Sequence, residues 1–71
     1  MKLVVNGEMR ELPDSLTIAD LVEQEAPGLG GGRGVAVAVD AEVVPRGDWA
    51  ATTLEPGQQV ELLAAMQGGA G

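Results

Sequence analysis

The residues of this chain that could do chemistry gather at its carboxyl end, in the stretch AAMQGGAG, Ala64 to Gly71. The usual catalytic side chains are missing, because the 71 residues include no histidine and no cysteine. Triads that need an imidazole or a thiol and zinc sites of the Cys/His type are therefore excluded. What the chain end offers is a carboxylate on a thin arm, since glycine has no Cβ and adopts backbone conformations closed to other residues.

The composition is that of a small acidic domain. Eleven acidic and four basic residues give a net charge of −7, which argues against nucleic acid as a partner, because phosphate contacts need lysine and arginine. Hydrophobic residues make up 45% of the chain, but they are too interrupted for a membrane span. The N-terminal stretch reaches a turn at Asn6-Gly7 before a signal-peptide core could form. We therefore expect a cytoplasmic protein of one domain that binds neither nucleic acid nor a membrane.

The sequence MKLVVNGEMREL predicts a β-hairpin. Asn6-Gly7 suits the positive φ angles of a type I′ turn, so strands are expected at 2–5 and 8–12. Pro13-Asp14 then ends the second strand.

The sequence SLTIADLVEQEAPG predicts a helix of about nine residues. Thr17 is a suitable N-cap, and Asp20 follows three positions later as a short variant of the capping box. Pro27-Gly28 ends the helix. A helix this short needs packing against a sheet. The residues expected between helix and sheet are Val5, Ile18, Leu21, Val22, Val37 and Val60.

The second half of the chain predicts three more strands. The run VAVAV at 35–39 alternates valine with alanine, and Asp40-Ala41 form a tight turn into a short strand at 42–44. The last strand is expected from Gln59 to about Ala65, and the segment 46–58 between them reads as irregular. Trp49, the one aromatic residue, either packs over the edge of the small core or is a partly exposed contact for a partner enzyme.

The glycine-rich stretch GLGGGRG, Gly28 to Gly34, is interpreted as a connection rather than a phosphate loop. It lacks the Lys-Ser/Thr pair of a Walker motif, and it follows a helix where a phosphate loop precedes one.

The order hairpin, helix, strand, short strand, final strand predicts an α+β fold of the β-grasp, or ubiquitin-like, type. The first and last strands lie parallel in a mixed sheet of four to five strands, with the helix on one face. The domain covers 1–65, and a flexible glycine-rich tail covers 66–71. The other face of the sheet carries Ala36, Ala38 and either Leu62 or Leu63, and such an uncovered apolar face is a candidate interaction surface.

A β-grasp domain whose last strand runs into Gly-Gly resembles the ubiquitin-like sulfur carriers. The sequence is most similar to the thiamine-biosynthesis carriers of the ThiS family from Val4 to Gly69, through VVNGE, TIADLVE and above all VVPRGDWA followed by MQGG. The small subunit of molybdopterin synthase also ends in Gly-Gly but has a longer passage between the first strand and the helix. That difference favours the thiamine branch.

The resemblance implies a function and its site residues. In such carriers an E1-like adenylating enzyme uses ATP to activate the terminal glycine carboxylate. Sulfur then displaces AMP, and the resulting thiocarboxylate gives its sulfur to thiazole synthase. The implied site is Gly69 as the adenylated end, with Gln67, Gly68 and Gly69 threaded into the partner. The chain itself is then no enzyme and is expected to have no catalytic side chain, bound cofactor or metal.

The end of the chain departs from the family, because Ala70-Gly71 follow the Gly-Gly pair. Three explanations of these two residues are open. A protease removes Ala70-Gly71 and exposes Gly69, Gly71 is itself activated, or the two residues are a cloning remnant. We favour Gly69 as the activated end. Three other functions stay open. They are a sulfur carrier for molybdopterin, cysteine or a secondary metabolite, a ubiquitin-like protein modifier, and a β-grasp binding module with an inert tail.

Overall fold

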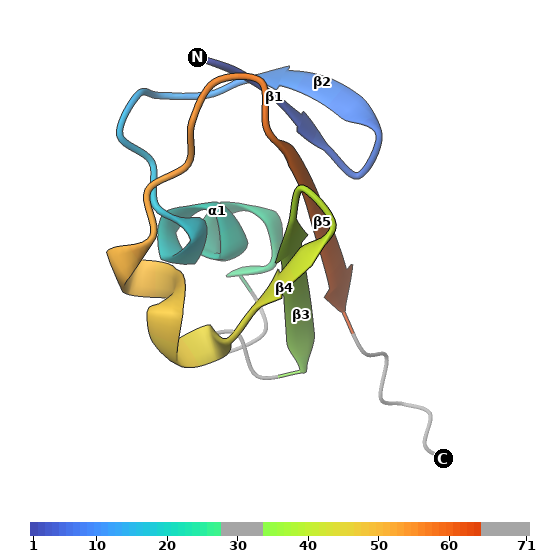
Figure 1. The fold of residues 1–71 in the computed structure, drawn as a ribbon, viewed down its shortest axis with the longest axis vertical. Coiled ribbons are helices and arrows are strands. Elements are labelled where there is room, and N and C mark those ends of the chain that lie inside the picture. Colours follow the sequence, from blue (N-terminus) through green and yellow to red (C-terminus); the bar gives the residue numbers. More distant parts are fainter. Residues whose placement is uncertain (28–33, 65–71) are drawn as a thin grey trace.

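The computed structural model describes residues 1–27 and 34–64. Predictions that fall on 28–33 and 65–71 lie outside the described residues. The elements follow the chain as shown in Figure 1: β1 (Lys2–Val5), β2 (Glu8–Glu11), α1 (Ile18–Glu25), β3 (Val35–Val39), β4 (Glu42–Val44), the 3₁₀ helix η2 (Arg46–Ala51) and β5 (Gln59–Ala64). Five predicted strands and one predicted helix are confirmed, each within about a residue of its expected bounds.

The five strands form one mixed sheet in the order β2-β1-β5-β3-β4. The strand β5 is central. It runs parallel to β1, with Val5 opposite Val60, and antiparallel to β3, from Val35 opposite Ala64 to Val39 opposite Val60. The two hairpins β1–β2 and β3–β4 therefore lie on either side of the strand that leads to the C-terminal tail. This arrangement confirms the predicted β-grasp fold.

Tight turns of one type close both hairpins. Asn6 and Gly7 have φ angles of 50° and 82°, and Asp40 and Ala41 have φ angles of 51° and 71°. Two successive positive φ angles define a type I′ turn, whose twist matches that of the strands it joins. The second turn places an alanine where glycine is preferred, so it carries some backbone strain.

The start of α1 is fixed by its capping box. The backbone N–H of Asp20 donates to Thr17 Oγ1 at 3.1 Å, and the backbone N–H of Thr17 donates to Asp20 Oδ2 at 3.1 Å. These two bonds satisfy donors that the first turn of a helix leaves unpaired. The predicted N-cap and its short-variant partner are both confirmed.

The hydrophobic core lies between α1, η2 and one face of the sheet, and Figure 1 shows both helices on the same side of the strands. All six residues predicted to lie between helix and sheet are at most 4% exposed. Their burial supplies the packing that a helix of eight residues needs. The other buried hydrophobic residues are Leu3, Leu12, Leu16, Trp49 and Leu54.

The segment predicted as irregular contains a 3₁₀ helix, so that part of the prediction is wrong. Pro45, with φ −62°, precedes η2, and the N–H of Asp48 donates to the Pro45 carbonyl at 2.9 Å. The hydroxyl of Thr52 donates to the Asp48 carbonyl at 2.7 Å and closes the other end. Proline fixes the φ angle at which such a turn starts.

Trp49 holds η2 against the core. Its side chain is 4% exposed, and its indole Nε1–H donates to the carbonyl of Val44 at 2.9 Å. Packing over the small core is therefore confirmed, and the alternative of a partly exposed partner contact at Trp49 is wrong. The indole buries a large apolar area and pairs its one polar group with a strand carbonyl.

Candidate functional site

The residues predicted to carry the chemistry lie beyond the part of the chain that the structure describes. These are Gln67, Gly68 and Gly69, with Gly71 as the alternative to Gly69. The structure does describe the strand that leads to them, since β5 ends at Ala64. The candidate site is therefore the end of β5 with the side chains that surround it.

Hydrogen bonds hold β5 on both of its edges. On the β1 side, the N–H of Val4 donates to the carbonyl of Gln58 at 3.1 Å, and the N–H of Asn6 donates to the carbonyl of Val60 at 2.9 Å. On the β3 side, the N–H of Asp40 donates to the carbonyl of Gln59 at 2.8 Å. The backbone N–H and C=O groups of even-numbered residues of β5 thus point toward β1, and those of odd-numbered residues point toward β3.

The side chain of Asn6 extends the β1 edge by one more hydrogen bond. The backbone pairing of β1 with β5 ends at Val5 opposite Val60, where the chain turns away. The N–H of Leu62 then donates to Asn6 Oδ1 at 2.8 Å. The side-chain oxygen of Asn6 takes the place of the next strand carbonyl.

A matching contact exists at the start of β5, on its other edge. The N–H of Gln59 donates to Asp40 Oδ1 at 2.9 Å. Both Asn6 and Asp40 are the first central residue of a type I′ turn, and such residues readily accept backbone hydrogen bonds. Sequence reasoning identified both turns but missed both contacts, because each depends on which strand lies beside the turn.

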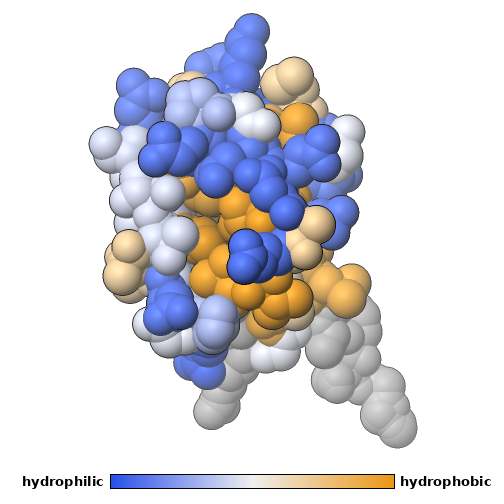
Figure 2. All heavy atoms as spheres, viewed as in Figure 1, coloured by the Kyte–Doolittle hydropathy of each residue, from blue (hydrophilic) through white to orange (hydrophobic). Residues whose placement is uncertain are grey.

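The face of the sheet opposite α1 carries large exposed apolar side chains. They are Met9 on β2, Val43 on β4 and Leu63 on β5, which are 66%, 72% and 72% exposed. Leu63, not Leu62, points to this open face; Leu62 is half-buried and packs against the core. Figure 2 shows a separate group of apolar atoms in the middle of the view, where the helices of Figure 1 meet the strands, with hydrophilic residues around them. The predicted uncovered apolar face is confirmed.

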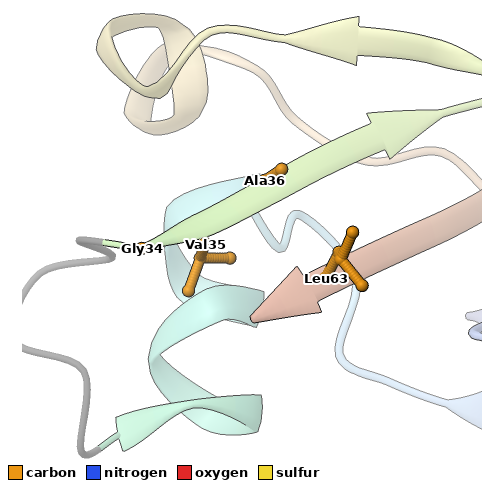
Figure 3. Close-up of a pocket in the computed structure, with 4 residues that line it drawn as sticks. All are labelled: Gly34, Val35, Ala36 and Leu63. Carbon is orange, nitrogen blue, oxygen red and sulfur yellow. The ribbon is translucent and has the colours of Figure 1, made fainter. Parts of the chain in front are cut away.

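A shallow hollow of about 320 Å³ lies where β3 begins and β5 ends, lined by Gly34, Val35, Ala36 and Leu63. Ala36 and Leu63 are opposite each other in the strand register, and Figure 3 shows them on the two adjacent strands. The hollow is largely apolar and adjoins the end of the strand that leads to the tail. Its size and lining suit an apolar side chain of another molecule.

An ion pair ties the second strand to the end of the helix. The guanidinium of Arg10 donates from Nη1 to Glu25 Oε1 at 3.1 Å and from Nη2 to Oε2 at 2.7 Å. This two-point hydrogen bonding, more than its charge, holds the pKa of the Glu25 carboxyl below its ordinary value. The pair lies on the helix side of the sheet, so it supports the fold and leaves the open face free.

Among the residues that the structure describes, no cluster of three or more histidine, cysteine, aspartate or glutamate side chains is placed to hold a metal ion. Within the same residues, no helix is long and apolar enough to cross a membrane.

A family model, a curated protein and two solved structures are similar to this chain. The family model described as "ThiS family" matches residues 3–69. A curated protein of Paramagnetospirillum magneticum (strain ATCC 700264 / AMB-1), named thiazole synthase, is 37% identical over 70 residues, which are 97% of this chain and 20% of that protein. The chain thus spans about a fifth of the length of this curated relative.

Two solved structures of the thiamine biosynthesis protein ThiS from Geobacter metallireducens are also similar. The crystal structure has a TM-score of 0.78 and 32% identity, and the match covers 97% of this chain and all of the other. The solution structure has a TM-score of 0.80 at the same identity, with 97% of this chain and 88% of the other covered. Likeness in sequence and in fold therefore extends over nearly the whole chain.

Proposed function

The chain belongs to the ThiS family, and from that premise we propose that it carries sulfur for the thiazole ring of thiamine as a thiocarboxylate on its terminal glycine. The observation that carries the proposal is the course of β5. This strand is the centre of the sheet, and in the sequence it leads directly into MQGG. In this proposal the folded domain supports a glycine-rich C-terminal segment whose carboxylate is the reacting group.

The proposed chemistry needs no acid or base from this chain. A carboxylate oxygen of the terminal glycine attacks the α-phosphorus of ATP on an E1-like adenylating enzyme, and pyrophosphate leaves. A hydrosulfide then attacks the acyl carbon, a C–S bond forms, and AMP leaves with the electron pair of the broken C–O bond. Glycine suits this step, because the absence of a Cβ leaves the line of attack on the carbonyl open.

Thiazole synthase is the proposed acceptor of the sulfur. The curated relative named thiazole synthase contains a segment similar to this chain within one polypeptide, which supports a working partnership between the two. The exposed Leu63 and the hollow beside Ala36 lie at the end of β5. They are the surface that we propose both partner enzymes contact while the tail occupies their active sites.

Gly69 is the proposed working end. The family match stops at Gly69, which supports removal of Ala70-Gly71 by a protease before activation. The alternative is that Gly71 is activated in the untrimmed chain. Intact mass of the protein isolated from its own cells tests both, because trimming and the replacement of oxygen by sulfur change the mass by different amounts. A protein that carries neither change in cells making thiamine contradicts the proposal.

The threading of the tail is tested by Gly68→Val. The added side chain should block a narrow channel and lower ATP–pyrophosphate exchange with the cognate activating enzyme by about a hundredfold, as misplacement of a reacting group does. The melting temperature should not change. Gly47→Val is the matched control, because a Cβ at Gly47 meets nothing within 4 Å and the same substitution there should leave exchange intact.

The exchange assay is run on the full chain and on a chain that ends at Gly69. Normal activation of Gly68→Val in both forms would refute the threaded arm. If only the shorter wild-type chain is activated, Ala70-Gly71 act as a removable cap. Equal activation of both wild-type forms would instead assign the sulfur to Gly71 as well.

A further inference from the structure

The side chains of Asp40 and Asn6 each accept a hydrogen bond from a backbone N–H of β5, on opposite edges of the strand. Asp40 accepts from the N–H of Gln59, the first residue of the strand, and Asn6 accepts from the N–H of Leu62. Each is the first central residue of a type I′ turn, with nearly equal φ angles of 51° and 50°. Only the Asn6 contact lies close to the tail, since Leu62 is four residues before Met66.

The hydrogen bond between Asn6 and Leu62 lies beyond the last backbone pair between β1 and β5. In the described part of the chain, the backbone pairing of these two strands ends at Val60. The N–H and the carbonyl of one strand residue point to the same edge, so both groups of Leu62 face the side that β1 has left. The side-chain oxygen of Asn6, 2.8 Å from the Leu62 nitrogen, is what holds this edge beyond the last backbone pair.

The turn itself does not require this oxygen. The positive φ of Asn6 is also available to glycine, and the Asn6 side chain is exposed, so it adds nothing to the buried core. Its acceptor therefore has a local effect, on the path of β5 at Leu62. The β1–β2 turn thus reaches across to the strand that leads to the tail.

We propose that Asn6 is a positioning residue that, together with the pairing of β5 to β3 as far as Ala64, sets the direction in which the tail leaves the domain. This role rests on the proposed function of the tail. The folded domain docks on the partner, and the carboxylate must then find a narrow channel a few residues away. A fixed exit direction raises the fraction of docked complexes in which the tail is threaded, because orientation that is set beforehand need not be gained during the reaction.

Three variants of the full chain separate positioning from stability. Asn6→Gly keeps the turn and removes the acceptor. Asn6→Asp keeps both, since aspartate tolerates positive φ and its carboxylate oxygen can accept from Leu62. Asp40→Gly is the matched control, because it makes the same change in the same type of turn and removes the same type of bond, but from the far end of β5.

The variants are measured in two ways. Amide hydrogen exchange by NMR reports whether Leu62 is still held, without any partner enzyme. Steady-state adenylation with the cognate activating enzyme separates kcat from KM, and a melting curve checks the fold. Loss of one hydrogen bond should lower the protection of the Leu62 amide in Asn6→Gly by about three- to tenfold.

The expected kinetic result is a change in kcat alone. Asn6→Gly should lower kcat by about the same three- to tenfold, with KM unchanged because the docking surface is intact. Asn6→Asp should restore both the protection of Leu62 and kcat. Asp40→Gly should lower the melting temperature as much as Asn6→Gly does but leave kcat at the wild-type value.

Several results would overturn the inference while leaving the proposed function standing. These are unchanged kcat in Asn6→Gly despite lost Leu62 protection, an equal loss of kcat in Asp40→Gly, or no recovery in Asn6→Asp. Failure of Asn6→Gly to fold would also overturn it, since Asn6 would then be structural. A wild-type chain that is not adenylated refutes the proposed function itself, and the positioning role with it, whatever the Leu62 amide shows.

Discussion

Replacing Leu21 with alanine tests whether the helix is held by packing rather than by its own propensity. The Leu21 side chain is 0% exposed and lies in the core with the buried Leu16, which precedes the N-cap. Burial of each methylene contributes about 0.8 kcal/mol, and the cavity left by leucine-to-alanine changes raises the total cost to about 2.7–5.0 kcal/mol. A domain of this size has about 4–11 kcal/mol of stability at about 0.05–0.15 kcal/mol per residue. Leu21→Ala should therefore remove roughly half of it.

Urea denaturation measures this loss, with the fluorescence of Trp49 as the probe, because Trp49 is the one aromatic residue and is buried beside the same core. Gln24→Ala, an exposed position on the same helix, is the control and should change stability by less than about 0.5 kcal/mol. Alanine favours helices slightly more than leucine, so propensity alone would make Leu21→Ala stabilising. A loss below about 1 kcal/mol at Leu21 would refute the packing argument.

Three further changes test single contacts. Because the pKa of Glu25 is lowered in the folded protein by Arg10, the stabilisation from this pair is present above the unfolded pKa of about 4.3 and is lost as the pH falls through the folded value. Arg10→Gln should thus be less stable than wild type at neutral pH and equal to it in acid, and a gap that does not vary with pH would contradict this. Trp49→Phe loses the hydrogen bond to Val44 and should lower the free energy of unfolding by about 0.5–1.5 kcal/mol beyond its packing loss. In the wild-type protein, iodide should barely quench the fluorescence of Trp49; strong quenching would mean an exposed indole. Ala41→Gly removes a side chain at φ 71° and should raise the melting temperature. The relief of about 1–2 kcal/mol of backbone strain exceeds the cost of the greater chain entropy of glycine in the unfolded state, about 0.5–1 kcal/mol. A lower melting temperature would show that the turn is unstrained.

Local chemistry made most of the fold predictable from the sequence. The Asn6-Gly7 and Asp40-Ala41 turns, the Thr17 cap and the valine alternation of β3 act within a few residues, so the sequence shows them directly. The stretch QQVELLA was harder, because two adjacent leucines give no alternation that chooses between the faces. The register settles the point, since Val60 lies in the core and side chains in a strand alternate.

The missed features depend on contacts between distant segments. The helix η2 contains Gly47 and depends on the burial of Trp49 in a core built from distant segments. The bond from Trp49 to Val44 spans only five positions, but it follows from that burial. The contacts of Asn6 and Asp40 with β5 join residues 56 and 19 positions apart. Sequence reasoning could place both turns, but only the strand order β2-β1-β5-β3-β4 brings β5 beside each of them.

The central place of β5 in the sheet has a mechanical consequence for the proposed function, in which partner enzymes act on the tail that follows this strand. A force applied along the tail acts along β5, and it must shear the hydrogen bonds to β3, paired from Val39 to Val35, together with those to β1. An edge strand would resist with one set of bonds, and those would break one after another if peeled. The hydrogen bonds of β5 therefore share the load on both of its edges. Under the proposed function, a partner enzyme would pull on the tail against both sets of hydrogen bonds of β5 at once, so the sheet should keep its pairing while the carboxylate reacts.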